Sequence, residues 1–345
     1  MVRAIPRQNP KNRFFAREVE LEVPAPPADL VLIDDHSRSI VAENDSPDVG
    51  FRFSVNPYRG CLHGCAYCYA RPSHEYLGLG TGSDFERKIL VKREAPTLLR
   101  AALEKRSWQG ELVVLSGNTD PYQPLEAECR LTRGCLEVLA DYRNPTHVIT
   151  KGTLVERDID VLRELAAHAR IGVSVSIPFW DARIARAIEP LTPTPARRFE
   201  TIRRLAAADI PVTVNVAPVI PGLGDRDIPK ILQAAADAGA RRAAFIVLRL
   251  PGSVKQVFEQ RLREQLPLRA DKILARTREV RGGRLNDPRF GSRMSGSGHY
   301  ADAIAELFQK AAARVGLATG ASVEPEPSTT FRRPTDRGGQ LRLFD

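Results

Sequence analysis

The stretch FSVNPYRGCLHGCAYCY, residues 53–69, joins a predicted β-strand to a loop that is rich in cysteine. Residues 53–57 are largely apolar, as is typical of a short strand that packs in a core. Three of the five cysteines follow within eight residues with the spacing C-x3-C-x2-C, at Cys61, Cys65 and Cys68. The stretch therefore predicts a strand whose carboxyl end leads into a cluster of metal-binding thiolates.

Three thiolates from one loop restrict the choice of metal. Soft sulfur ligands select zinc or an iron–sulfur cluster, and three of them can hold three irons of a cubane while the fourth iron has no protein ligand. Gly60 and Gly64 directly precede two of the cysteines and permit backbone turns that aim the sulfurs at one centre. The alternative is a closed Cys3His zinc site with His63 or His74 as fourth ligand, although no second cysteine pair at zinc-knuckle spacing is present.

The composition of the chain excludes several classes of protein. Its 345 residues are 43% hydrophobic and 27% charged, and no apolar run approaches the ~18 residues of a membrane span, so a soluble globular protein is expected. The N-terminal residues are polar and basic, unlike a secretory signal, which predicts a cytoplasmic location and no membrane partner. Cys129 and Cys135 lie on different faces of a helical pattern and are expected only to pack.

From residue 51 onward, short apolar runs alternate with amphipathic helical stretches, the pattern of parallel strands joined by helical crossovers. Strands are predicted at 53–57, 112–116, 147–150, 172–177, 212–217 and 244–248. Helices are predicted at 94–106, 126–142, 157–168, 195–208, 227–238, 253–265 and 299–315. These units predict an α/β fold, a partial (β/α)6 barrel whose strands are covered on both faces and whose ligands gather at the carboxyl ends of the strands.

Changes in composition divide the chain into four parts. Residues 1–50 are expected to form an N-terminal extension over the core, 51–265 the barrel, 266–318 a basic helical segment, and 319–345 a disordered tail. The stretch 269–293 carries eight Arg or Lys against three acidic residues. Together with a net charge of +9 it predicts a surface that contacts phosphate groups, with a merely solvated face as the alternative.

The motif C-x3-C-x2-C, with Tyr67 directly before the third cysteine, resembles the signature of the radical S-adenosylmethionine (SAM) superfamily. That resemblance implies a 4Fe-4S cluster held by Cys61, Cys65 and Cys68, whose open iron binds the amino and carboxylate groups of SAM. One electron, from a donor such as flavodoxin or ferredoxin, then cleaves SAM to methionine and a 5′-deoxyadenosyl radical. The radical abstracts a hydrogen atom from the substrate.

Two segments resemble one branch of that superfamily, the spore photoproduct lyase-like or DNA repair photolyase-like proteins. They are SGNTDPYQPLE at 116–126 and CAYCY at 65–69, and the likeness extends over about 50–255. It implies that Tyr67 and Tyr69 flank the adenine of the cofactor or relay a radical. It also implies further cofactor contacts, made by Thr119, Asp120, Lys151 and Ser176.

One departure from this branch concerns the lesion that its members repair. Spore photoproduct lyases carry a cysteine after the second strand, which returns a hydrogen atom to the repaired base. Residues 112–123 contain no cysteine here. Repair of that particular lesion is therefore not expected, and the identity of the substrate stays open.

The last residues, QLRLFD, follow a polar stretch and resemble the pentapeptide that binds the bacterial sliding clamp. The resemblance assigns the contacts to Gln340, Leu341, Leu343 and Phe344. Apolar side chains in a solvated tail need a pocket, either on a partner or on the same chain. The alternative is that they tuck against the barrel of this chain.

Three functions are compatible with these observations. The first is a radical SAM enzyme that acts on nucleic acid, in DNA repair or base modification, with DNA as its partner. The second keeps the same chemistry but acts on a protein side chain or a small metabolite. The third is a non-catalytic protein whose cysteine loop binds zinc or senses the redox state.

Overall fold

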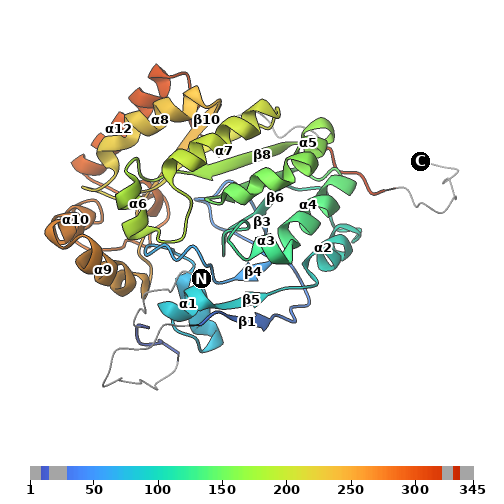
Figure 1. Cartoon of the computed structure of the whole chain (residues 1–345), viewed down its shortest axis with the longest axis horizontal. Coiled ribbons are helices and arrows are strands. Elements are labelled where there is room, and N and C mark those ends of the chain that lie inside the picture. The colour runs from blue at the N-terminus through green and yellow to red at the C-terminus, as the bar shows by residue number, and fades with distance from the viewer. Residues whose placement is uncertain (1–8, 15–28, 321–328, 335–345) are drawn as a thin grey trace, which may run out of the picture.

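Six parallel strands form the centre of the fold (Figure 1). The computed structural model describes residues 9–14, 29–320 and 329–334. The strands lie side by side in chain order, each parallel to the next, as the sequence predicts. They are β3 (Phe53–Val55), β6 (Val113–Leu115), β7 (Thr146–Thr150), β8 (Ile171–Ser176), β9 (Val212–Val219) and β10 (Arg242–Val247).

The barrel is partial because its two edges do not meet. One edge of the described sheet is β10, and the other is β2 (Val41–Glu43), which pairs antiparallel with β3. Each strand except β10 is followed by a helix that covers the outer face of the sheet (Figure 1). These helices are α2 (Ala95–Leu103), α4 (Leu131–Asp141), α5 (Ile159–His168), α7 (Pro195–Ala207) and α8 (Ile228–Asp237).

The main core lies between the sheet and these helices. Strand residues such as Val148 and Val214 are fully buried against helix residues such as Leu162 and Ile202. Burial of a side chain of this size stabilises the fold by about 1.5–3 kcal/mol. The amphipathic periodicity therefore predicts these helices correctly, with one interruption.

The helix predicted over 126–142 is interrupted. It consists of α3 (Glu126–Cys129) and α4, separated by Arg130, which has a left-handed φ of 52°. The buried carboxylate of Glu126 accepts a hydrogen bond of 3.0 Å from the backbone nitrogen of Thr132, in the first turn of α4. A continuous helix would commit that N–H group to its own backbone, so this contact favours the break.

A second sheet of three strands lies beside the barrel and was not predicted (Figure 1). Strand β1 (Val31–Asp34) pairs in parallel with β5 (Lys88–Val91), which pairs antiparallel with β4 (Tyr58–Arg59). The side-chain amide of Asn12 also donates to the carbonyl of Glu75 at 3.2 Å. The N-terminal region therefore contributes to both sheets, through β1 and β2.

The remaining elements connect these units or follow the barrel. They are η1 (Arg71–Leu77), α1 (Ser83–Arg87), η2 (Thr153–Asp158), α6 (Ala182–Ile188), η3 (Asp225–Asp227), α9 (Val254–Gln265), α10 (Pro267–Glu279), α11 (Ser292–Ser295) and α12 (His299–Arg314). Phe308 of α12 packs into the main core. Among the described helices, none is long and apolar enough to cross a membrane.

The inner face of the sheet is more open than predicted. Along β9, fully buried residues that belong to the main core alternate with half-exposed Thr213, Asn215 and Ala217. The same alternation on β7 leaves His147 and Ile149 half-exposed. The prediction that the strands are covered on both faces therefore holds for β8, where Ser174 and Ser176 are buried, and is wrong for β7 and β9, whose inner-face residues are only partly buried.

The tail predicted to be disordered from residue 319 is ordered in part. Residues 329–334 lie against the barrel, where the Phe331 ring stacks on Tyr142 with 6.1 Å between centroids. The backbone nitrogen of Arg332 donates to the carbonyl of Tyr142 at 2.9 Å. An apolar anchor and backbone pairing thus fix this segment, whereas the sliding-clamp-like motif at 340–344 lies outside the described residues.

Candidate functional site

The cysteine loop, residues 60–69, follows the first barrel strand and is largely buried. Cys61 and Cys65 are buried, Cys68 is half-buried, and all three are free thiols. Gly60 has a left-handed φ of 85°, and a Cβ atom there would lie 2.9 Å from the carbonyl oxygen of Phe85. Glycine is therefore required at this turn, as predicted.

Arg71 fixes the backbone of this loop. Its guanidinium is fully buried and donates to the carbonyl of Cys65 through Nε at 3.0 Å and Nη2 at 2.8 Å. It also pairs with Glu86 at 2.6 Å and donates to the carbonyl of Thr81 at 2.7 Å. The planar guanidinium also donates to the carbonyl of Gly82 at 3.2 Å, and its contacts with three carbonyls and a carboxylate hold the loop in one conformation.

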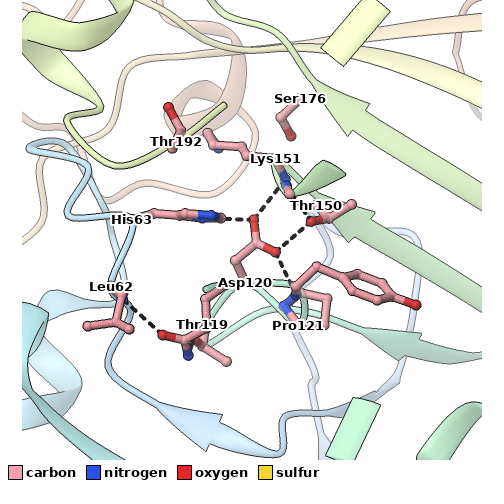
Figure 2. Close-up of polar contacts among 12 residues, drawn as sticks. Leu62, His63, Thr119, Asp120, Pro121, Thr150, Lys151, Ser176 and Thr192 are labelled. Atoms are coloured by element: carbon pink, nitrogen blue, oxygen red, sulfur yellow. Dashed lines mark hydrogen bonds and ion pairs between the residues drawn. The ribbon is translucent and has the colours of Figure 1, made fainter. Parts of the chain in front are cut away.

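Asp120 lies at the centre of a polar network that joins the loop to the next two strands (Figure 2). Its carboxylate is 3.3 Å from His63 Nδ1, and it accepts hydrogen bonds from the Thr150 hydroxyl at 2.5 Å and the Lys151 backbone nitrogen at 2.7 Å. Burial alone would raise the pKa of Asp120, but the charge of His63 and these hydrogen bonds lower it to about 2. Asp120 is therefore ionised and positions His63 within the loop.

Thr119 and Gln123 hold the loop from the same segment. The Thr119 hydroxyl donates to the carbonyl of Gly60 at 2.7 Å. Gln123, fully buried, donates to the same carbonyl at 3.1 Å and accepts from the backbone nitrogen of Leu62 at 2.9 Å. The polar groups of Thr119 and Asp120 are thus engaged with protein atoms, which makes both positioning residues, while their predicted contact with a cofactor stays a prediction.

We expect Asp120→Asn to destabilise the fold by about 1–3 kcal/mol, because it removes the charge opposite His63 and places an amide among buried donors. Asp141→Asn is the matched control, since Asp141 pairs with Arg100 at 2.7 Å on the surface, with both side chains about half exposed. Its effect should stay below about 1 kcal/mol. Anaerobic urea unfolding measures both values, and equal losses would contradict the role of Asp120.

Tyr67 belongs to a second buried network. Its hydroxyl donates to Glu189, whose other oxygen pairs with Arg198 at 2.5 Å, and both of these side chains are fully buried. Burial and the Glu189 charge raise the pKa of Tyr67, so its phenol remains a donor. Arg198 also donates to the carbonyl of Ser176 at 2.8 Å, while the Lys151 ammonium lies 5.7 Å from the centre of the Tyr67 ring.

The structure brings most of the predicted site residues together. Lys151 lies beside the loop, since its ammonium is 5.7 Å from the centre of the Tyr67 ring. Ser176 is buried at the carboxyl end of β8 and lies near Lys151 in Figure 2. Tyr69 differs from these because its side chain is 52% exposed and turns toward solvent.

Several residues that shape the site were missed by the sequence analysis. Gln123 lies inside the quoted segment at 116–126, so its position was a usable signal. The other missed residues form two buried ion pairs, 15 and 9 residues apart in the chain, that follow no periodic pattern. They are Arg71, Glu86, Glu189 and Arg198.

Both histidines proposed as a fourth zinc ligand make other polar contacts in the structure. His63 faces Asp120, and His74 packs edge-on against Phe85 while its Nε2 contacts the carbonyl of Lys88 at 3.0 Å. Within the described residues, no three His, Cys, Asp or Glu side chains are arranged around one metal-ion position.

Two curated relatives, each described as an uncharacterized protein, match parts of this chain. A protein of Mycobacterium tuberculosis (strain ATCC 25618 / H37Rv) is 40% identical over 210 residues, which are 60% of this chain and 62% of that protein. A protein of Methanocaldococcus jannaschii is 28% identical over 176 residues, which are 51% of this chain and 63% of that protein. The chain therefore spans less than two thirds of the length of these relatives.

A solved structure and a family model describe the fold and the family of this chain. Spore photoproduct lyase complexed with dinucleoside spore photoproduct superposes with a TM-score of 0.58 at 17% identity, over 84% of this chain and 81% of that chain. This likeness shows a shared fold and confirms the partial barrel. Residues 55–235 match the model of the Radical SAM superfamily. Because that match covers more than half of the chain and includes the cysteine loop, the chain belongs to the radical SAM superfamily.

Proposed function

We propose that this protein is a radical SAM enzyme that acts on nucleic acid. The observation that carries the proposal is the cysteine loop: three thiols at the carboxyl end of the first barrel strand, fixed by Arg71, Asp120 and Gln123 beside the open inner face of the sheet. The family implies a 4Fe-4S cluster and SAM. An external one-electron donor such as flavodoxin or ferredoxin is part of the proposal.

The residues present fit this cofactor pair. Cys61, Cys65 and Cys68 are the three soft ligands that a cubane with one open iron requires. On the inner face, the side-chain oxygen Oδ1 of Asn215 is buried and has no hydrogen-bond partner among the described residues. Asn215 stands opposite Ser176 in the sheet register. An unpaired buried acceptor in a half-exposed polar wall suits a ligand that carries hydroxyl groups, such as the ribose of SAM.

Each residue of the site has a role toward these groups. The three cysteines would hold the cluster, which when bound supplies the electron that converts SAM to methionine and a 5′-deoxyadenosyl radical. Arg71 and Gln123 keep the loop backbone in place, so the thiol positions are set before the cofactor binds. The Lys151 ammonium places a positive charge beside Tyr67 and the loop, where it complements an anionic group of the cofactor.

A nucleic acid substrate is supported by fold and charge. The fold resembles that of spore photoproduct lyase, one structure of which holds a dinucleoside spore photoproduct. The net charge of +9 favours a polyanion. The stretch 269–293 offers less positive charge to a polyanion than its sequence suggests. Arg276 and Arg289 pair with acidic neighbours, and the buried Arg281 donates to backbone carbonyls.

The test is the stimulation of SAM cleavage by DNA. After anaerobic reconstitution and reduction with dithionite, we expect single-stranded or duplex DNA to increase 5′-deoxyadenosine formation severalfold over protein and SAM alone. Chromatography measures the product. Formation that DNA leaves unchanged, but that a peptide or metabolite mixture increases, would contradict the nucleic acid substrate and support the alternative.

We also propose that the C-terminal motif at 340–344 binds the bacterial sliding clamp. The sequence QLRLF supports this, and the segment at 329–334, which packs against the barrel, would join the clamp-bound motif to the enzyme and hold it near DNA. A peptide of residues 334–345 should bind a bacterial clamp with micromolar affinity by calorimetry. Leu343→Ala with Phe344→Ala should abolish binding, and no binding by the native peptide would contradict the proposal.

A further inference from the structure

Arg249 follows the last barrel strand, β10, and has an unusual environment. Its Nε atom is buried and has no hydrogen-bond acceptor in the described part of the chain. Its Nη1 atom contacts the Met294 sulfur at 3.4 Å, and its guanidinium lies 5.9 Å from the centre of the Tyr69 ring. Among the described residues, no carboxylate pairs with it at ion-pair distance.

The neighbouring arginines are satisfied by the protein, which sets Arg249 apart. Arg293 pairs with Asp48 and also contacts Ser46. Arg281 donates to the carbonyls of Val247 and Leu248 at 2.9 and 2.7 Å. Burial, and then the positive charge of Arg293, lower the pKa of Arg249. The nearest acidic group, Asp48, pairs with Arg293, so no carboxylate is left to pair directly with Arg249, and an anion bound to this partly buried guanidinium would supply that partner.

The position of Arg249 relates it to the cysteine loop. Tyr69, whose ring it contacts, directly follows Cys68 and is 52% exposed. The carboxyl ends of parallel strands form the ligand-binding end of such folds. An anion on Arg249 would therefore lie at the rim of the site, with the exposed Tyr69 ring beside it as a surface on which a base can stack.

We propose that Arg249, together with Tyr69, binds a phosphodiester group of the nucleic acid substrate at the mouth of the barrel. This inference rests on the proposed function and names the contact that holds the substrate next to the cysteine loop. A guanidinium suits a phosphate because its donors form a planar fork that meets two oxygens. The aromatic neighbour adds a contact that does not depend on the base sequence.

The experiment compares two matched charge removals at opposite ends of one strand. Arg249→Gln removes the cation at the carboxyl end of β10. Arg241→Gln removes the exposed cation that precedes the amino end. Each reconstituted full-length protein is titrated with a fluorescent single-stranded oligothymidylate, once with phosphodiester linkages and once with neutral methylphosphonate linkages. Iron content confirms that each variant assembles its site. Arg249→Lys is a second variant, which keeps the positive charge but lacks the planar pair of guanidinium donors.

The expected result is a loss that depends on the phosphate charge. Arg249→Gln should weaken binding of the phosphodiester strand by about tenfold to hundredfold, the range for a charged hydrogen bond. It should also reduce the slope of log affinity against log salt by about 0.7. Binding of the methylphosphonate strand should change less than twofold, and Arg241→Gln should change neither. Arg249→Lys should retain the salt slope and lose part of the affinity.

Three outcomes would overturn the inference, and they differ in what else they overturn. If the wild-type protein binds neither strand, the proposed nucleic acid substrate fails together with this contact. If the wild-type protein binds the phosphodiester strand and Arg249→Gln binds it equally well, only the Arg249 contact fails. If Arg249→Gln weakens SAM binding as strongly as it weakens oligonucleotide binding, the anion on Arg249 belongs to the cofactor.

Discussion

Cys61→Ala, Cys65→Ala and Cys68→Ala should each reduce the iron bound after reconstitution to near zero and abolish 5′-deoxyadenosine formation. A cubane with one open iron needs a thiolate on each of its other three irons. The described residues around the loop offer no fourth cysteine to replace a lost one. Iron analysis and the visible absorbance of the reconstituted protein measure assembly independently of activity.

Cys129→Ala is the matched control for these variants. Cys129 belongs to α3 and packs beside Leu131 against the small cluster around Tyr58, which is separate from the core cluster that contains Cys65. We expect it to keep both iron and SAM cleavage. Loss of iron in Cys129→Ala, or its retention in any of the three loop variants, would contradict the assignment of the ligands.

Arg71→Met should destabilise the protein by about 3–5 kcal/mol, the cost of removing one member of a buried ion pair. The substitution keeps most of the apolar volume but removes the donors to the carbonyls of Cys65 and Thr81 and leaves Glu86 without its guanidinium. Anaerobic urea unfolding of the metal-free protein measures the free energy, and a lower iron content should accompany it because the loop is no longer fixed.

Arg100→Met provides the comparison for Arg71→Met. Arg100 pairs with Asp141 at 2.7 Å on the surface, where solvent screens both charges. Its loss should change the free energy of unfolding by less than about 1 kcal/mol. A small effect of Arg71→Met, similar to that of Arg100→Met, would show that the loop holds its conformation without the buried guanidinium.

The barrel could be predicted from the sequence because its signals are local. Each barrel strand is a short apolar run, and the helices between strands repeat their apolar residues with helical spacing. The cysteine loop was recognisable for the same reason, since all three thiols and both glycines lie within nine residues. The left-handed turn at Gly60 agrees with its predicted role.

The parts that were missed depend on specific contacts that leave no periodic pattern in the sequence. The break at Arg130 follows from a buried carboxylate, and a helical pattern contains no sign of it. Strand β1 gains its place only by pairing with β5, more than fifty residues later in the chain. The pair between Glu189 and Arg198 likewise has no periodic signature, although it fixes the hydrogen bond of Tyr67.

The inner face of the sheet differs from the prediction that both faces of the strands are covered, and this difference bears on function. Thr213 and Asn215 alternate with valines along β9, a pattern that indicates one apolar and one polar face. A barrel filled by its own side chains would be apolar inside. The partly buried polar residues of β9 instead agree with the proposed binding of SAM and substrate on this face of the sheet.

The most direct test of the account is the fate of SAM in the reduced, reconstituted protein. Full-length wild-type protein and Cys65→Ala are reduced with dithionite under anaerobic conditions and incubated with SAM, with and without single-stranded DNA, and the products are separated by chromatography. The account predicts that the wild-type protein forms 5′-deoxyadenosine and methionine, more so with DNA, and that Cys65→Ala forms neither. A wild-type protein that takes up zinc in place of iron and leaves SAM intact would contradict it.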